Sequence, residues 1–156
     1  MAIEKVRDYF RPFGVESRIQ EFDVSSATVE MAAQALNIEG KRIAKTLAFR
    51  YFDQTLLIVT AGDAKIDNSK FKSHFNLKAR MLDAQETEEK VGHAVGGVCP
   101  FAVNHNCVVV LDVSLKRFET VYPACGSSQS AIELNLAELE KLSQSTQWVD
   151  VCKEWV

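Results

Sequence analysis

The sequence predicts an α+β domain built on a mixed, largely antiparallel β-sheet that is flanked by helices. A chain of 156 residues with 47% hydrophobic content can bury one sizeable core but hardly two. Helical and strand patterns alternate irregularly, and most connections between strand candidates are too short for the crossover that a parallel pair needs. Because there is no internal repeat and no linker rich in Pro, Gly or Ser, we expect a single domain over residues 1–156.

Two helices are expected in the first forty residues. Apolar residues recur at helical spacing over residues 3–13, and Gly14 can end that helix. The segment SSATVEMAAQALNIEG, residues 25–40, predicts a second helix with a glycine after its end. Ser26 or Thr28 can cap its N-terminus.

The strongest strand signal is a hairpin. Residues 43–51 and 55–60 form two strand-like runs, and the turn between them is expected at Asp53-Gln54. The remaining elements are short: helices at 67–74 (capped by Asp67), 84–91 and 135–142 (capped by Asn135), and strands at 107–112, 120–122 and 131–134.

Charge and hydropathy narrow the class of partner. A net charge of −3 argues against wrapping a long nucleic-acid backbone, although contact with one end of a nucleic acid stays open. Three basic groups, Lys41, Arg42 and Lys45, are local to one segment. We interpret the basic residues between 65 and 80 as solvated surface.

No apolar run is long enough to span a bilayer, and the start MAIEKVRDYF lacks a signal-peptide core, so a cytoplasmic protein without membrane contact is expected.

The cysteines and histidines do not form a metal or redox motif. Cys99, Cys107, Cys125 and Cys152 are too widely spaced for a CxxC pattern, so free and mostly buried thiols are expected. No HExxH, DxD or clustered His/Cys spacing is present, and no metal is predicted. His93 is the histidine that lies beside a candidate site loop.

Lys45 is unusual because it shares the apolar face of its predicted strand. Alternation along KRIAKTLAFR places it with Ile43, Leu47 and Phe49. A lysine near a strand end can direct its ammonium to water, which would make the position structural. Alternatively, the ammonium projects into a cleft and holds an anion such as a phosphate or a developing oxyanion.

Two loops interrupt apolar segments in the second half of the chain. In AVGGVCPFAV, Gly96 and Gly97 remove side chains where another group must approach closely, and Pro100 withholds its N–H from a ladder. A second break occurs in VYPACGSSQSAIEL, at Pro123 and Gly126. Each loop alone is explained equally well as a turn or a bulge.

Together, KRIAKTLAF, AVGGVCPF and TVYPACGSSQSAIEL resemble the YbaK/prolyl-tRNA synthetase-associated domain family in their order and separation. The likeness extends over nearly the whole chain, from SSATVEMAAQALNI to NLAELEKL. Members of that family are aminoacyl-tRNA editing domains, often freestanding, that hydrolyse mischarged tRNA. The resemblance implies a compact mixed fold with a curved central sheet and no cofactor. Its implied partners are the acceptor end of an aminoacyl-tRNA, a tRNA such as tRNA(Pro), and an aminoacyl-tRNA synthetase; a homodimer stays open.

The resemblance also assigns residues to roles. Lys45 matches the characteristic lysine of the family and would anchor the terminal phosphate or ribose. The amides of Gly97 and Gly126 would stabilise the oxyanion, so that water hydrolyses the ester without a protein nucleophile. On this reasoning a valine at position 97 would enter the substrate space. The residues expected around the substrate are Phe22, Thr46, Gly96, Val98, Cys99, Pro100, Ala124 and Cys125.

Some positions depart from the branch of the family that edits cysteinyl-tRNA. Ala124 and Ala131 stand where that branch carries serine and aspartate, and Phe22 stands where it carries tyrosine. Cys99 occupies a position where serine is common, and we interpret it as part of the pocket wall. The expected substrate therefore carries a small amino acid such as Ala, Ser, Thr or Cys. A non-catalytic tRNA- or synthetase-binding module and a thiol redox sensor are the alternatives.

Overall fold

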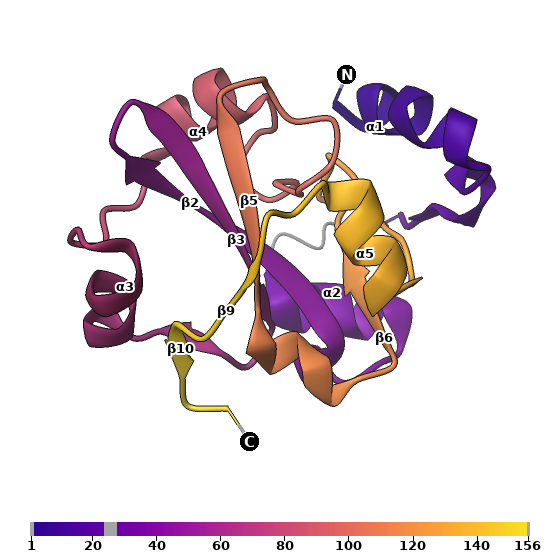
Figure 1. The fold of residues 1–156 in the computed structure, drawn as a ribbon. Helices are drawn as coiled ribbons and strands as arrows, with labels where there is room; N and C mark the ends of the chain where they lie inside the picture. The colour runs from indigo at the N-terminus through magenta and orange to yellow at the C-terminus, as the bar shows by residue number, and fades with distance from the viewer. Residues whose placement is uncertain (1, 24–27, 156) are drawn as a thin grey trace.

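The computed structural model describes residues 2–23 and 28–155. In this part of the chain a six-stranded mixed sheet with the order β8-β6-β2-β3-β5-β9 forms the centre, and five α-helices surround it (Figure 1). The helices are α1 (Ala2–Phe10), α2 (Val29–Leu36), α3 (Asn68–Phe75), α4 (Ala84–Val91) and α5 (Leu136–Ser143). The strands of the central sheet are β2 (Ile43–Tyr51), β3 (Gln54–Ala61), β5 (Cys107–Asp112), β6 (Thr120–Pro123), β8 (Leu134–Asn135) and β9 (Trp148–Val149). Two small sheets pair β1 (Gln20–Glu21) with β7 (Ser130–Ala131) and β4 (Lys65–Ile66) with β10 (Cys152–Lys153).

The predicted hairpin is confirmed as β2 and β3, which pair from Ala44↔Ala61 to Tyr51↔Gln54. Its turn lies at Phe52 and Asp53, one residue earlier than expected. Phe52 adopts a left-handed conformation with φ of 57°, as the first central residue of a favoured two-residue hairpin turn does. Strand β3 is buried from Thr55 onwards, so the hairpin supplies the middle of the sheet and much of the core.

The predicted fold class is confirmed, and strand direction is mixed. Among the described residues, four of the seven strand pairings are antiparallel. The parallel pair β3–β5 is possible because the chain between these strands is long and carries α3 and α4. Those two helices lie on the left in Figure 1, on the side opposite α5.

The predicted helices form with small changes at their ends. Helix α1 stops at Phe10 and continues as a 3-10 turn through Phe13, because Pro12 cannot donate an α-helical hydrogen bond; Gly14 then ends the segment with φ of 73°. Thr28 caps α2 by accepting a hydrogen bond from the Met31 N–H at 3.2 Å. The alternative cap, Ser26, lies outside the described residues.

Two further elements differ from expectation. Asn37 ends α2 in a left-handed conformation with φ of 57°, in place of the glycine at position 40, because asparagine also tolerates that conformation. The strand expected at 131–134 is split between β7 and β8, which belong to different sheets. Between them the Ile132 N–H donates to the Pro123 carbonyl at 3.0 Å. Asp67 and Asn135 cap α3 and α5 as predicted.

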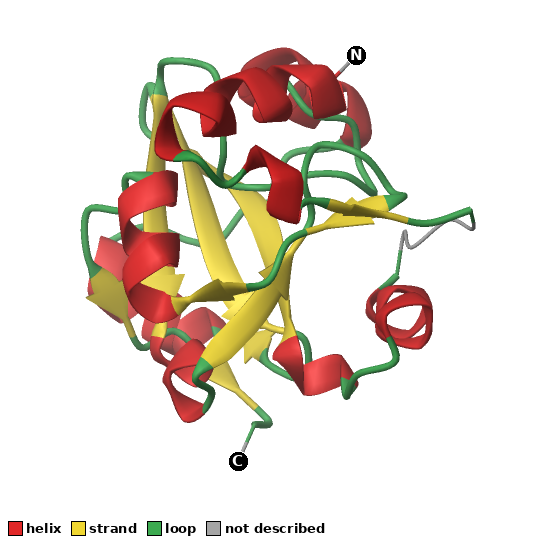
Figure 2. Cartoon of the chain, turned by 90° about the vertical axis from the view of Figure 1, so that its right-hand side faces the viewer, coloured by secondary structure: helices red, strands yellow, loops and turns green. Residues whose placement is uncertain are grey.

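Helix α2 is held differently from the other helices. A small cluster of Ala32, Ala33 and Ile43 forms its buried contact, separate from the main core. In Figure 2 it is the helix at the right-hand edge that follows the grey segment. All four cysteines are free, and all but Cys107 are buried, as predicted. Among the described residues no helix is long and apolar enough to cross a membrane.

Candidate functional site

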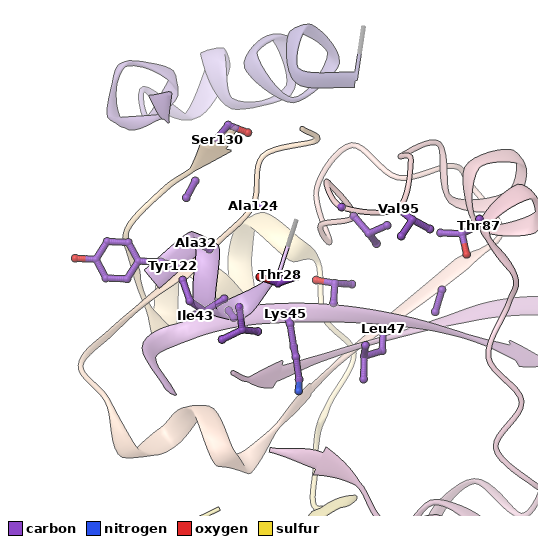
Figure 3. Close-up of a pocket in the computed structure, with 18 of the residues that line it drawn as sticks. Thr28, Ala32, Ile43, Lys45, Leu47, Thr87, Val95, Tyr122, Ala124 and Ser130 are labelled. Atoms are coloured by element: carbon purple, nitrogen blue, oxygen red, sulfur yellow. The ribbon is translucent and has the colours of Figure 1, made fainter. Parts of the chain in front are cut away.

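A pocket of about 500 Å³ lies between α2 and the edge of β2. Helix α4, the loop around Gly96 and the segment from β6 to β7 complete its walls (Figure 3). Apolar side chains dominate the lining: Val29, Ala32, Ile43, Ala44, Leu47, Ala48, Met81, Leu82, Ala84, Val95, Val98, Ala124 and Ala131. The other lining residues are Thr28, Lys45, Thr46, Thr87, Gly96, Tyr122 and Ser130.

The pocket exists because β2 has an open edge. Strand β6 pairs with β2 at Ile43 and Ala44 and then diverges. Further along, the Leu82 N–H donates to the Ala48 carbonyl at 3.0 Å, and the Arg50 N–H donates to the Arg80 carbonyl at 2.9 Å. No described strand pairs with this edge of β2 in the gap between these two contacts, so the pocket opens onto bare backbone.

Thr46 lies in the middle of this open edge. Backbone groups of successive strand residues point to opposite sides, so Thr46 points the same way as Ala48, away from β3. Its hydroxyl oxygen is also buried and has no hydrogen-bond partner among the described residues. Thr46 thus presents an N–H, a carbonyl and a hydroxyl to the pocket, and all three can bind a polar ligand.

Lys45 extends from the opposite side of β2. Its half-buried ammonium donates to the Gly62 carbonyl at 3.4 Å. In Figure 3 it points away from Ala124 and Ser130. Burial lowers the pKa of Lys45, and the nearby carboxylate of Asp63 offsets this only in part. Because Arg117 holds that carboxylate in a two-point ion pair, the Lys45 ammonium has no carboxylate within 4 Å among the described residues and is available to an anion.

The loop at residues 94–99 presents two free amides. The Gly97 N–H donates to the Ala94 carbonyl at 3.0 Å, which closes a turn. Gly96, in that turn, has φ of 100°, a conformation that favours glycine. The flanking N–H groups of Gly96 and Val98 have no acceptor within the described part of the chain, and both residues line the pocket. The amides suited to an oxyanion are therefore those on either side of Gly97.

Gly97 and Gly126 bring two loops into contact. A Cβ atom on Gly97 would lie 2.6 Å from the backbone N and Cα of Ser127. The expectation that a side chain at position 97 would enter the substrate space is therefore wrong, because it would strike the neighbouring loop. Gly126 has φ of 91°, and a Cβ there would lie 2.8 Å from the Ala2 carbonyl oxygen. Both glycines are needed for backbone packing.

Cys99 is buried behind this loop contact. Its Sγ lies 3.5 Å from His93 Nε2, a pairing that the sequence did not reveal. Burial raises the pKa of the Cys99 thiol to about 12, although a backbone hydrogen bond from Gly126 opposes the shift. A neutral thiol with no exposed surface is a poor nucleophile. Cys99 therefore serves packing in this geometry.

The structure brings together part of the predicted site. Lys45, Thr46, Gly96, Val98 and Ala124 line the pocket. The other residues expected there are outside its lining: Gly97, Cys99, Pro100, Cys125 and Gly126 are buried, and Phe22 is half-buried with its N–H on the Gln129 carbonyl at 2.9 Å.

Four polar residues of the pocket were not predicted from the sequence. Thr28 caps α2 and Thr87 lies in α4, and no local pattern reveals where these helices lie relative to β2. Tyr122 and Ser130 flank the second glycine loop, and that proximity was the available signal. The Arg42 guanidinium lies 5.1 Å from the centre of the Tyr122 ring and orients it. Among the described residues no three His, Cys, Asp or Glu side chains gather as a metal site.

The sequence matches a known family and several known proteins. The aminoacyl-tRNA editing domain family matches residues 23–142. A protein of Bacillus subtilis (strain 168), YwhH, which is described as uncharacterized, is 54% identical over 156 residues, and the match covers 99% of each chain.

Longer proteins and solved structures are also similar. The proline–tRNA ligase of Geobacillus sp. (strain WCH70) is 25% identical over 103 residues, which are 65% of this chain and 18% of the ligase. The chain therefore spans less than a fifth of that relative. A crystal structure of a candidate trans-editing enzyme for prolyl tRNA synthetase superposes with a TM-score of 0.87 at 25% identity and covers 97% of both chains.

Proposed function

We propose that the protein, which belongs to the aminoacyl-tRNA editing domain family, hydrolyses the ester bond of mischarged tRNA in trans. The observation that carries the proposal is the pocket at the open edge of β2, which combines an ammonium without an ion pair, free backbone amides and a mainly apolar lining. The likeness to a candidate trans-editing enzyme supports tRNA(Pro) or a related tRNA as the carrier.

Among the small amino acids expected from the sequence, the lining favours one with an apolar side chain. Methyl groups of Ala44, Ala48, Ala124 and Ala131 occupy the walls and offer a polar side chain no hydrogen-bond partner. An apolar pocket rejects an added hydroxyl only about 10²-fold. Ala is therefore our first candidate, with Ser, Thr and Cys as poorer substrates of the same site.

Lys45 and the loop amides would act on opposite ends of the substrate. The ammonium, directed away from Ala124, binds the phosphate or ribose of the terminal adenosine. The N–H groups of Gly96 and Val98 hold the ester carbonyl and its oxyanion, while Gly97 and Gly126 hold the loops together. A water oxygen attacks the carbonyl carbon, the carbon–oxygen bond to the ribose breaks, and the ribose oxygen leaves with a proton.

A deacylation assay tests this function. The purified protein is incubated with tRNAs that carry Ala, Ser, Thr, Cys or the cognate amino acid, and free amino acid is measured over time. We expect release of a small mischarged amino acid and no release of the cognate one. If the protein binds these tRNAs and releases nothing, it is the non-catalytic module.

The variant Cys99→Ser distinguishes attack by water from attack by a cysteine thiol. Because the thiol is neutral and buried, we expect the variant to keep its parental rate, with folding checked by thermal denaturation. A folded variant without activity would contradict the water mechanism.

A further inference from the structure

His93 sits at the junction between α4 and the loop that carries the free amides. It follows Gly92, which ends α4 in a left-handed conformation with φ of 96°. The imidazole has no exposed surface. Its Nε2 lies 2.7 Å from the Phe101 carbonyl oxygen, so the ring connects the two ends of the segment 93–101.

The hydrogen bond fixes the protonation state of the ring. A carbonyl oxygen can only accept, so Nε2 carries the proton and donates it to Phe101. Nδ1 is then a bare lone pair, and it is buried with no partner among the described residues. Burial also lowers the pKa of His93 below its ordinary value of 6.5. His93 is therefore neutral in the folded protein near pH 7.

We infer that His93 is a positioning residue that holds the Gly96 and Val98 amides in place by closing the segment 93–101. The inference rests on the proposed function for its catalytic readout. Cys99, next to the ring, is part of the same closure, and the Asn104 N–H fixes the far side by donating to the Val91 carbonyl at 2.9 Å. Because the ring reaches no substrate, it acts through the loop.

This closure makes the loop sensitive to acid. A second proton on the ring would place an N–H at Nδ1, where no described acceptor lies. The charged group that acts on His93 is Lys5 of α1, a cation that disfavours the imidazolium further. Cys99 and the adjacent Cys125 are neutral thiols whose pKa is raised by burial, so they supply no counter-charge. The Phe101 carbonyl still accepts from Nε2–H and offsets burial only in part, so a second proton places an uncompensated charge and an unpaired Nδ1–H inside the closure, which loosens it and shifts the amides that it holds.

Three variants test the role in deacylation. His93→Gln retains a side-chain N–H donor that does not titrate, so we expect kcat near the parental value and loss of the acid limb of its pH profile. His93→Leu removes the donor, and we expect kcat to fall about 10²-fold with KM little changed, as for loss of an oxyanion donor. The matched control is His74→Gln on α3, an exposed histidine bonded to Gln147, which should change neither. An unaltered acid limb in His93→Gln, or a folded His93→Leu with parental kcat, overturns the inference.

A measurement without substrate keeps this inference separate from the proposed function. In NMR spectra recorded from pH 7.5 to 5, the amide signals of Gly96 and Val98 should titrate together with His93 in the parental protein and stay fixed in His93→Gln. If they do not move with His93, the positioning role is wrong even for an active deacylase. If they move while no mischarged tRNA is hydrolysed, the loop role stands and the proposed function fails.

Discussion

Lys45 is a residue whose placement does not favour stability. Its ammonium is half-buried, and among the described residues it makes one long hydrogen bond, to the Gly62 carbonyl. Desolvation is the main reason that its pKa falls. A charged group that loses hydration without gaining an ion pair destabilises the fold. The sequence already marked Lys45 as a candidate, because a lysine on an apolar strand face is unusual, and the structure places it in the pocket lining.

Lys45→Met should abolish most deacylation without weakening the fold. The methionine keeps the apolar stem and removes the desolvated charge, so we expect an equal or higher melting temperature and a rate lowered about 10²-fold. At pH values between the lowered pKa of folded Lys45 and 10.5, the lysine is protonated in the unfolded chain more than in the folded one. The free energy of unfolding of the parental protein should therefore rise with pH in this range, and that of Lys45→Met should not. Thermal melts across alkaline pH, together with the deacylation assay, check both parts. A variant with parental activity would remove Lys45 from the site.

Gly97→Val should cost stability as much as activity. A Cβ at this position would lie 2.6 Å from Ser127 backbone atoms, which cannot move as a flexible side chain could. We expect several degrees of loss in melting temperature, since a clash of this kind typically costs about 1–3 kcal/mol. Ala94→Val, an exposed change in the same loop, is the control and should leave stability intact. A variant as stable as the control would show that the loops are not in close contact.

The sequence could indicate the glycine loops, but not which glycine faces the pocket and which packs against the neighbouring loop. Composition shows that Gly96 and Gly97 lack side chains, yet only the fold shows that Gly96 faces the pocket and Gly97 faces Ser127. The same limit applies to Cys99 and His93, whose contact depends on a loop closing on itself. The local sequence shows where the backbone is free to adopt unusual conformations, but tertiary packing determines which groups each residue contacts.

At the scale of elements, local chemistry predicted most of the fold. Helix α4 and strand β5 have the predicted bounds, because a capping aspartate and a β-branched run define them locally. The failures were elements defined by their partners. Residues 131–134 read as one strand, but Ser130 and Ala131 pair with β1 while Leu134 and Asn135 pair with β6. No local signal distinguishes two short strands in different sheets from one continuous strand.

Thr28→Ala should loosen α2 and leave the rest of the molecule folded. Thr28 caps this helix, and α2 is attached through a small cluster of its own. Losing a cap costs about 1 kcal/mol, which should raise amide hydrogen exchange in α2 about fivefold. Asn135→Ala, which removes the cap of α5, is the matched control and should not affect exchange in α2. Equal exchange in the parental protein and Thr28→Ala would contradict a separately attached helix. Because α2 forms a wall of the pocket, the KM for deacylation should rise in Thr28→Ala and stay unchanged in Asn135→Ala.

At the scale of the whole molecule, most basic side chains are already neutralised. Lys41 pairs with Glu39, and Arg42 contacts Glu133. Two of the lysines interpreted as solvated surface are also in ion pairs: Lys65 with Glu154, and Lys70 with Asp150. Exposed pairs of this kind add little stability, but they reduce the positive charge offered to a phosphate backbone. The net charge of −3 acts in the same direction.

The affinity for tRNA should therefore depend only weakly on salt. Each phosphate neutralised by the protein contributes about −0.9 to the slope of log K against log salt for a duplex, so contact with one end predicts a slope of about −3 or shallower. Fluorescence anisotropy with labelled tRNA at several NaCl concentrations measures it. Lys65→Gln and Lys70→Gln, which remove cations already held by carboxylates, should leave the slope unchanged. A slope near −6, or a clear reduction in either variant, would mean that an extended basic face carries the tRNA and that these ion pairs open on binding. A shallow slope that persists in both variants would place the binding energy at the acceptor end, where the pocket receives the aminoacyl group.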